Sequence, residues 1–434
     1  MQTDVAIVGA GLTGLTAAVY LARAGLQVAV FEKAASPGGR AATQVYQGYC
    51  LNRGGHALYP GGAATRVLRE LGISFQAGSP RRVQVLSHGR FFAYPADPAS
   101  FLTTALLSRS EKMELLRVLT RLALHKPQSL ADLSVQKWID DHVRHEDVRQ
   151  FLLASARTLT YSANLELTSM EPVVTQLQLS LKRPVLYIDG GWQTLVAGLR
   201  RAAEQAGARL YTGRRVTAVA QSDGRVGGLE LSEGYLCEAR AVLLAIEPAD
   251  VLRLLPDPLL RERLGRLRPL PVACLDVALQ RLPCPARPVS LDLDQPRFYS
   301  AQSLFARVAP AGGALLHAVR YLDPTDPGEA REHERELEEL LDLAQPGWRD
   351  LVIKRFFLPR LLVTGAVPLA ESAGFAGRPE PRVEHIRGLY LAGDWVGREG
   401  YLADACFASA RQAALLLLAE LAGRQSPHRL RAAA

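Results

Sequence analysis

Residues 4–14 read Asp4-Val5-Ala6-Ile7-Val8-Gly9-Ala10-Gly11-Leu12-Thr13-Gly14, and this stretch decides the fold prediction. The apolar run at 4–8 predicts a buried parallel strand, because such strands are covered on both faces. Residues 15–24 are rich in alanine and leucine and predict a helix that ends at Gly25. A second strand is predicted at 27–31 and is followed by Glu32. Strand, glycine turn, helix, strand and acid therefore follow one another within one βαβ unit.

Each glycine of the turn has its own task in binding a dinucleotide. Gly9 permits the sharp turn, Gly11 lets a pyrophosphate approach the backbone, and Gly14 lets the helix pack close to the strand. The helix start directs unpaired N–H groups and its positive dipole end at the phosphates. Glu32, about twenty residues beyond the turn, is placed to accept hydrogen bonds from an adenosine ribose. The spacing favours a dinucleotide site over a glycine-rich turn in an ordinary α/β domain.

Composition limits the class of protein. A chain of 434 residues is too long for one ordinary core, so roughly two or three domains are expected. With 48% hydrophobic and 22% charged residues, a soluble globular protein without a transmembrane helix is predicted, and the apolar residues 413–419 are explained as buried. The five cysteines are widely spaced, which favours reduced thiols over a disulfide framework or a zinc site. No basic segment typical of a signal peptide precedes the first strand, so a cytoplasmic location is expected.

The charge of +8 is spread along the chain without a dense basic block. Nucleic acid is therefore not expected as a partner, and weak attraction to anionic lipid or substrate is the better explanation. Ser108 and Glu111 have the spacing of a capping box and begin a predicted helix that runs to about His125. This helix is amphipathic and basic, so a peripheral membrane contact stays open, although a core-facing helix with a solvated side is the more common case.

Three further motifs follow along the chain. Pro37-Gly38-Gly39-Arg40 combines a flexible backbone with a guanidinium that can reach a pyrophosphate. Gly54-Gly55-His56 precedes a helix that ends at Glu70-Leu71-Gly72. Leu391-Ala392-Gly393-Asp394 ends a predicted buried strand, and a long helix starts near Tyr401.

In this order, the four pieces resemble the FAD-dependent oxidoreductases that include flavin amine oxidases, protoporphyrinogen oxidases and phytoene desaturases. The resemblance covers nearly the whole chain. It implies an α/β fold with a Rossmann-like FAD-binding domain of the GR2 flavoprotein type and an inserted substrate domain of mixed sheet and helices. Residues 1–78, 184–250 and 360–424 would form the FAD-binding domain, 79–183 and 251–359 the substrate domain, and 425–434 a flexible tail.

The resemblance also implies the cofactor contacts. The residue matching Val216 contacts adenine through its backbone, and Asp394 matches an aspartate that accepts a hydrogen bond from the ribityl chain. The helix starting near Tyr401 would aim its positive end at the N1–C2=O edge of the flavin, where reduction places negative charge. The predicted cofactor-binding residues are Gly9, Ala10, Gly11, Leu12, Thr13, Gly14, Glu32, Lys33, Gly38, Gly39, Arg40, Gly54, Gly55, His56, Val216, Gly393, Asp394, Gly400, Tyr401 and Leu402.

Because a flavin carries out the redox step, no dedicated acid, base or nucleophile triad is required, and none stands out. The nine histidines lack metal-ligand spacing, so no metal is expected. No catalytic residue is assigned. His56 is a weak candidate for acid–base work, and a hydrogen bond to cofactor or backbone alone is the preferred interpretation. Residues that could line the pocket are Arg53, Tyr161, Tyr299, Arg320, Trp395 and Tyr401.

Two departures from relatives narrow the reaction. Residues 270–277 lack the lysine that amine oxidases often carry in a substrate-domain strand. Cys406 lies inside the last predicted helix, away from the position at which some relatives tether the flavin, so non-covalent FAD is expected. The sequence favours removal of a hydride from a C–H bond of a hydrophobic, isoprenoid-type small molecule, as in desaturases and dehydrogenases. The alternatives are an amine or porphyrinogen oxidase that uses oxygen, and a non-catalytic lipid-binding escort like the Rab GDP-dissociation inhibitors. The exact substrate, the electron acceptor and the oligomeric state stay open.

Overall fold

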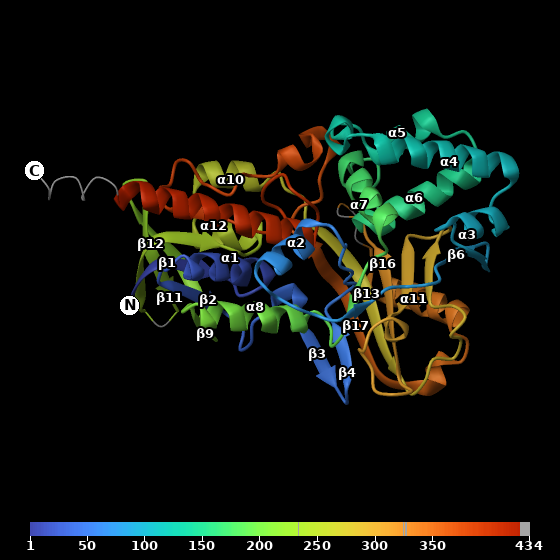
Figure 1. Cartoon of the computed structure of the whole chain (residues 1–434), viewed down its shortest axis with the longest axis horizontal. Coiled ribbons are helices and arrows are strands. Elements are labelled where there is room, and N and C mark those ends of the chain that lie inside the picture. Colours follow the sequence, from blue (N-terminus) through green and yellow to red (C-terminus); the bar gives the residue numbers. More distant parts are fainter. Residues whose placement is uncertain (233, 324, 326–327, 426–434) are drawn as a thin grey trace, which may run out of the picture.

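Two seven-stranded sheets organise the molecule, one in each half (Figure 1). The structure is a computed structural model that describes residues 1–232, 234–323, 325 and 328–425, and every structural statement below concerns these residues. The predicted tail at 425–434 lies outside this range except for Gln425.

The first sheet contains the glycine turn. Its strand order is β10-β11-β12-β1-β2-β9, with β18 also paired to β12, and β10 and β11 are antiparallel to their neighbours. The strands are β1 (Gln2–Val8), β2 (Val28–Glu32), β9 (Arg209–Thr212), β10 (Val216–Ser222), β11 (Arg225–Leu231), β12 (Leu236–Leu244) and β18 (Leu389–Leu391). Alternate side chains of β1 enter two different cores, Val5 and Ile7 on one face and Ala6 and Val8 on the other. Burial on both faces is why this strand consists of an unbroken apolar run.

Helices cover both faces of this sheet. The helices on the Val5 face are α1 (Leu12–Arg23), α2 (Ala63–Glu70), α8 (Gln193–Gln205) and α12 (Ala403–Gln425). The helices on the Val8 face are α9 (Pro248–Leu254) and α10 (Pro258–Leu264). This doubly covered, largely parallel sheet is the predicted Rossmann-like architecture.

The second sheet has the order β17-β13-β16-β15-β14-β6-β7. Its strands are β6 (Gln84–Ser87), β7 (Arg90–Ala93), β13 (Leu270–Leu279), β14 (Val289–Asp292), β15 (Arg297–Ala301), β16 (Ala314–Tyr321) and β17 (Val352–Thr364). Helix α11 (Ala330–Ala344) packs on one face, with Leu337, Leu340 and Leu341 against Leu275 and Leu316. The opposite face turns toward the first half, where Ala278 and Leu315 pack with Tyr49 and Leu51. Two-stranded sheets pair β3 (Thr43–Tyr46) with β4 (Tyr49–Asn52) and β5 (Ala77–Gly78) with β8 (Tyr187–Ile188).

A helical layer completes the second half (Figure 1). It consists of α3 (Pro98–Thr103), α4 (Arg109–Leu124), α5 (Val135–His142), α6 (Glu146–Thr160) and α7 (Met170–Lys182), which share one apolar core. The predicted capping box is present, because the Ser108 side chain accepts the Glu111 N–H and the Glu111 side chain accepts the Ser108 N–H.

The structure corrects two of the predicted boundaries. The boundary between 359 and 360 falls inside β17, which continues in the second sheet to Thr364. The boundary between 250 and 251 falls inside α9, and both α9 and α10 pack on the first sheet and not in the second half. Pro256 and Pro258 separate the two helices, because a proline interrupts a continuing helix.

Helix α12 differs from the expectation that no segment is long and apolar enough to span a membrane. Its residues Ala403–Ala422 have that length and composition, with a mean hydropathy of 1.4. Half of the span is buried inside the protein, where α12 packs against α1 and α2. The apolar composition of α12 is thus what a central core helix needs.

Candidate functional site

A cavity lies where the two halves meet, with about 1880 Å³ of empty space including its open mouth. One side comes from the loops of the first sheet, and we call it the glycine wall: residues 9, 11–13, 31–33, 38–41, 214–216, 245–247, 250, 253 and 254. The other side, which we call the apolar wall, consists of Tyr59, Tyr161 and Leu361 to Val363. Arg53 to Ala57, Trp192, Asp394 and the start of α12 lie between them.

The three glycines of the turn occupy different surroundings. Gly9 has a φ of +99°, and a side chain there would begin 2.5 Å from the Ala245 carbonyl oxygen. A Cβ on Gly14 would lie 1.9 Å from the Gly9 carbonyl oxygen, so helix and strand pack too closely for any other residue. Gly11 faces the cavity, since the nearest atom to a Cβ there is the Gly38 oxygen at 3.9 Å. Gly11 also begins α1 without a side-chain cap or an acidic residue in the first turn, which leaves the helix start open to an anion.

Glu32 ends β2 at the cavity edge. Its two carboxylate oxygens accept the Ala10 and Ala34 N–H groups, each at 2.9 Å. These bonds fix the carboxylate beside the turn, and its remaining lone pairs are available to ligand hydroxyls.

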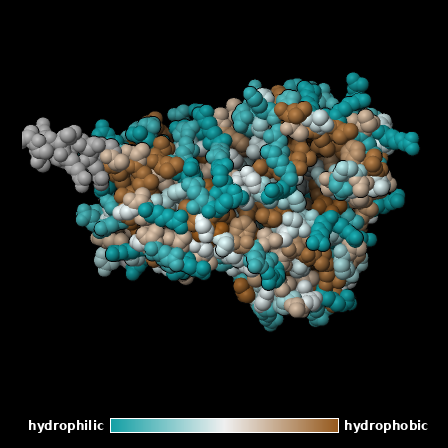
Figure 2. Space-filling view, in the orientation of Figure 1, coloured by the Kyte–Doolittle hydropathy of each residue, from teal (hydrophilic) through white to brown (hydrophobic). Residues whose placement is uncertain are grey.

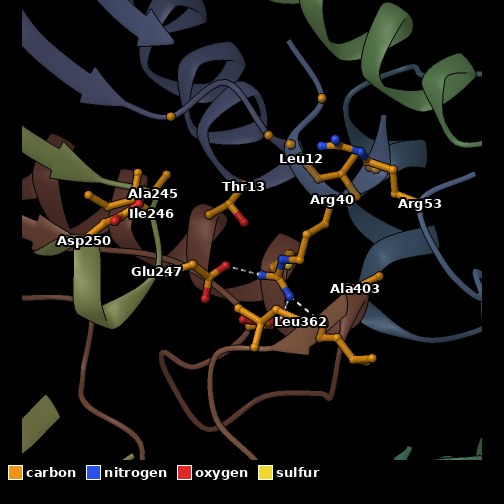
Figure 3. Close-up of a pocket in the computed structure, with 18 of the residues that line it drawn as sticks. Leu12, Thr13, Arg40, Arg53, Ala245, Ile246, Glu247, Asp250, Leu362 and Ala403 are labelled. Carbon is orange, nitrogen blue, oxygen red and sulfur yellow. Dashed lines mark hydrogen bonds and ion pairs between the residues drawn. The ribbon is translucent and has the colours of Figure 1, made fainter. Parts of the chain in front are cut away.

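Arg40 lies in the middle of the cavity wall between two carboxylates (Figure 3). Its Nη1 donates to Asp394 Oδ2 and to the Val363 carbonyl oxygen, each at 2.5 Å, and its Nη2 lies 3.0 Å from Glu247 Oε1. Burial alone would lower the pKa of Arg40, but the two carboxylates raise it above its ordinary value. Burial also raises the pKa of Glu247 to about 7, against the opposing effect of Arg40. The guanidinium expected to reach a pyrophosphate is therefore already paired, and Glu247 is the partner whose charge changes near neutral pH.

His56 is held by its own backbone. Its Nδ1–H donates to the Gly54 oxygen at 2.8 Å, and its ring packs at 4.8 Å from the Trp192 ring. Burial lowers the pKa of His56 to about 4, so the ring is neutral at pH 7. His56 thus hydrogen-bonds to the backbone beside the cavity, as in the interpretation that the sequence analysis preferred over acid–base work.

The structure brings most of the predicted residues to the cavity and leaves five behind it. Those lining it are Gly9, Gly11, Leu12, Thr13, Glu32, Lys33, Gly38, Gly39, Arg40, Gly54, Gly55, His56, Val216, Asp394 and Leu402. Ala10 and Gly14 belong to the packed side of the turn, and the Gly393 N–H donates to Ser409. Gly400 packs on Asp404, and the Tyr401 hydroxyl donates to the Thr160 oxygen, away from the cavity.

Of the other suggested pocket residues, Arg53 and Tyr161 line the cavity and three do not. Tyr299 packs in the core under α11, Arg320 pairs with Glu336, and the Trp395 indole donates to the Ile246 oxygen. Tyrosine and tryptophan are often buried in cores, and arginine can be buried when it is paired, so residue type alone does not identify a pocket residue.

The apolar wall is made by segments far apart in sequence. Leu361, Leu362 and Val363 come from β17, and Tyr161 follows α6 in a left-handed conformation with φ +61°. The Tyr161 hydroxyl donates to the Gly55 oxygen at 3.3 Å, which ties the helical layer to the glycine-rich segment. Among the described residues of the second half, no carboxylate lines the cavity.

A buried acid–histidine pair behind this wall escaped the sequence analysis. Asp276 on β13 and His317 on β16 are direct cross-strand partners, 3% and 2% exposed, and His317 Nδ1 is hydrogen-bonded to Asp276 Oδ1. His317 Nε2 has no hydrogen-bond partner and points at Gly55, where a Cβ would lie 2.8 Å away. The sequence contains no local signal for this pair, because the two residues are 41 positions apart and only the register of β13 and β16 brings them together.

Glu247 was also missed, although a signal was present. It comes shortly after β12, and the residues between them, Ala245 and Ile246, also line the cavity. An acid directly after the carboxyl end of a parallel strand lies where ligands bind in such folds.

Comparison with known proteins gives the family. The model of the family described as flavin containing amine oxidoreductase matches residues 12–418. A mouse protein named pyridine nucleotide-disulfide oxidoreductase domain-containing protein 2 is 23% identical over 353 residues, which cover 65% of this chain and 61% of the mouse protein. The chain thus spans about three fifths of the length of that relative. Hydroxysqualene dehydroxylase of Rhodopseudomonas palustris is 37% identical over 87 residues, 19% of this chain and 21% of that protein.

Solved structures share the fold. An oxidoreductase from Methanosarcina mazei superposes with a TM-score of 0.75 at 21% identity, over 95% of this chain and 99% of its own. A putrescine oxidase bound to putrescine gives a TM-score of 0.75 at 17% identity, over 96% and 99% of the two chains.

Proposed function

The chain belongs to the family of flavin-containing amine oxidoreductases, and from this premise we propose that it is a flavin-dependent oxidoreductase that binds FAD non-covalently and removes a hydride from a hydrophobic, isoprenoid-type molecule. When bound, the flavin supplies the hydride acceptor. The protein's part is to hold the substrate C–H bond against it and to exclude water.

The glycine wall supports FAD as the flavin. The open start of α1 and the backbone at Gly11 suit a pyrophosphate, while Glu32 and Val216 at the cavity edge suit an adenosine. Cys406 also lines the cavity, but burial raises the pKa of its thiol to about 12. Because the thiolate is the reactive form, this supports non-covalent binding.

The composition of the apolar wall is the observation that carries the substrate proposal. Its members are tyrosine, leucine and valine, and the carboxylates of the cavity are confined to the side of the first sheet and Asp394. A cationic amine would find no carboxylate on the apolar wall and would meet the guanidinium of Arg53 near Gly54. A neutral hydrocarbon chain gains from this surface by burying its own apolar area. The local similarity to hydroxysqualene dehydroxylase agrees with such a substrate.

The test uses the purified protein as isolated. Heat-released cofactor should co-elute with FAD and not with FMN. Anaerobic mixing with squalene-type and carotenoid-type isoprenoids in detergent should bleach the flavin band, whereas putrescine and porphyrinogens should leave it unchanged. Bleaching by amines or porphyrinogens with peroxide formation in air would replace this proposal with the oxidase alternative. A colourless protein that cannot be loaded with FAD would favour the lipid-escort alternative.

We also propose that the protein works in the cytoplasm and touches a membrane peripherally through α4. On α4, Met113, Leu116 and Leu124 are 51%, 47% and 81% exposed, and Arg117 and Arg121 on the same helix are exposed as well. Figure 2 shows hydrophobic residues between hydrophilic ones over the helical layer. Exposed apolar side chains next to arginines suit an anionic lipid surface that would deliver a hydrophobic substrate.

A further inference from the structure

Arg378 is a buried arginine that the site described above does not use. It follows the short 3-10 helix Gly374–Gly377 and is 3% exposed. Its Nη1 donates to the Gly400 oxygen at 2.9 Å, and its guanidinium carbon lies 4.4 Å from the Phe375 ring centre and 5.7 Å from that of Tyr401. The guanidinium is therefore fixed against the turn that begins α12.

The charge of Arg378 is poorly compensated. Its Nε and Nη2 have no hydrogen-bond partner, and within the described part of the chain no carboxylate oxygen lies within 4.0 Å of it. The nearby carboxylates are committed elsewhere, Glu171 to the Phe375 N–H and Asp394 to Arg40. Burial lowers the pKa of Arg378 to about 10, which still leaves it charged at pH 7. A buried cation without a direct ion-pair partner costs folding stability, so an anion placed near Arg378 would be stabilised.

The cavity lies on the other side of the same turn. Arg378 contacts Gly400 and Tyr401, and the next residues along the chain, Leu402 and Ala403, line the cavity at the start of α12. Arg378 also interacts electrostatically with Asp394 and Cys406, which line the same cavity. Leu402 has a φ of +52°, an unfavourable conformation for a leucine, and it lines the cavity directly before the start of α12. The positive end of the α12 dipole and the positive charge of Arg378 thus act on the same region with the same sign.

We propose that Arg378 is a fixed cation that stabilises the negative charge of the reduced flavin through the Gly400–Leu402 turn and so sets the reduction potential of the enzyme. It is a positioning residue, because a layer of backbone separates it from the cavity. Because the effective dielectric constant inside a protein is low, a charge that does not touch an anion still changes the energy of that anion. The inference rests on the proposed FAD site with the flavin ring at the start of α12, and it does not depend on the substrate.

The experiment compares the midpoint potential of the FAD-loaded wild type with that of Arg378→Met, by reduction in the presence of a reference dye. Arg378→Met should shift the potential downward, equivalent to about a tenfold weaker binding of reduced relative to oxidised flavin. Its thermal stability without cofactor should be equal to or above that of the wild type, since a buried unpaired charge is replaced by an apolar side chain. Arg378→Lys should give an intermediate potential.

The matched control is Arg382→Gln, a change in the same loop whose side chain is 44% exposed and which should leave the potential unchanged. If Arg378→Met does not fold, Arg378→Gln keeps a donor for the Gly400 oxygen while removing the charge. The proposal would be overturned if the folded variant, Arg378→Met or Arg378→Gln, had the midpoint potential of the wild type. It would also be overturned if Arg382→Gln shifted the potential equally. A wild-type protein that binds no flavin would instead overturn the proposed function.

Discussion

The two walls of the cavity follow opposite physical rules. The glycine wall is polar backbone and paired charge: the open start of α1, Glu32 on two N–H groups, and Arg40 between Asp394 and Glu247. The apolar wall is side-chain surface from Tyr59, from β17 and from the residue after α6. The first wall constrains the shape of the backbone and can hold one kind of ligand, whereas the second constrains only polarity and volume. The structure of the cavity therefore restricts the class of cofactor more strongly than it restricts the substrate.

The largest effect should come from the glycine wall. Gly14→Val should destabilise the protein by about 4 kcal/mol or more and abolish flavin binding, because its Cβ would begin 1.9 Å from the Gly9 oxygen. Urea unfolding and the flavin content of the purified protein measure both effects. As a control, Gly227→Ala, where the nearest atom is 3.7 Å away, should cost no more than about 1 kcal/mol. Normal flavin content in Gly14→Val would show that the helix and strand can separate here.

Behind the apolar wall, the buried pair should be the most sensitive point. His317→Ala leaves Asp276 buried without its partner and should cost about 3–5 kcal/mol in urea unfolding. The matched control is His385→Ala, which breaks a partly exposed pair with Asp257 and should cost less than about 1 kcal/mol. Equal costs for the two variants would contradict the distinction between a buried and a surface pair.

Glu247→Gln should increase the difference between the two walls, because it removes a negative charge from the glycine wall and so favours binding of an anion there. Burial raises the pKa of Glu247 to about 7, so its carboxyl is neutral below that pH and charged above it. Flavin affinity in the wild type should fall as pH rises through 7, because the carboxylate then competes with the pyrophosphate for Arg40. The raised pKa of Glu247 also affects the free energy of unfolding. Its stabilising contribution is complete below the ordinary glutamate pKa and is lost as the pH rises from there through about 7.

The measurement is flavin binding by fluorescence quenching at pH 6 and pH 8. At pH 8, Glu247→Gln should bind flavin up to about tenfold more tightly than the wild type does. Its flavin affinity should no longer fall between pH 6 and pH 8. The exposed Glu262→Gln on α10 serves as the control and should behave as the wild type. Weaker binding in Glu247→Gln would show that this carboxylate positions Arg40 for the cofactor.

The smallest effect is expected on the outer surface of the second half. Leu116→Ser should reduce co-sedimentation with vesicles containing anionic lipid by a few fold, because one 47% exposed apolar side chain is lost from α4. Leu304→Ser, at a 45% exposed leucine outside the helical layer, is the control and should have no effect. Wild-type sedimentation of Leu116→Ser would remove α4 from the membrane proposal.

Sequence reasoning reached the glycine wall because its determinants are local. The turn at 9–14, the acid at Glu32 and the Gly38–Arg40 loop are each read within a few residues, and all contribute to the cavity. It misjudged Tyr401, whose hydroxyl turns to Thr160 instead of the cavity. It also did not foresee that Arg40 would be paired with Glu247, because that contact joins loops 207 positions apart.

The sequence by itself determined the doubly wound first sheet, the glycine turn and the order of the motifs that place this chain among the flavin-containing amine oxidoreductases. These follow from backbone rules, in which glycine, apolar periodicity and helix starts act over short distances. Only the tertiary structure decided the apolar wall, the Asp276–His317 pair and the buried Arg378. Each arises where strands or turns distant in the chain pack together, and the energy of a buried charge or apolar surface depends on neighbours that local sequence does not specify.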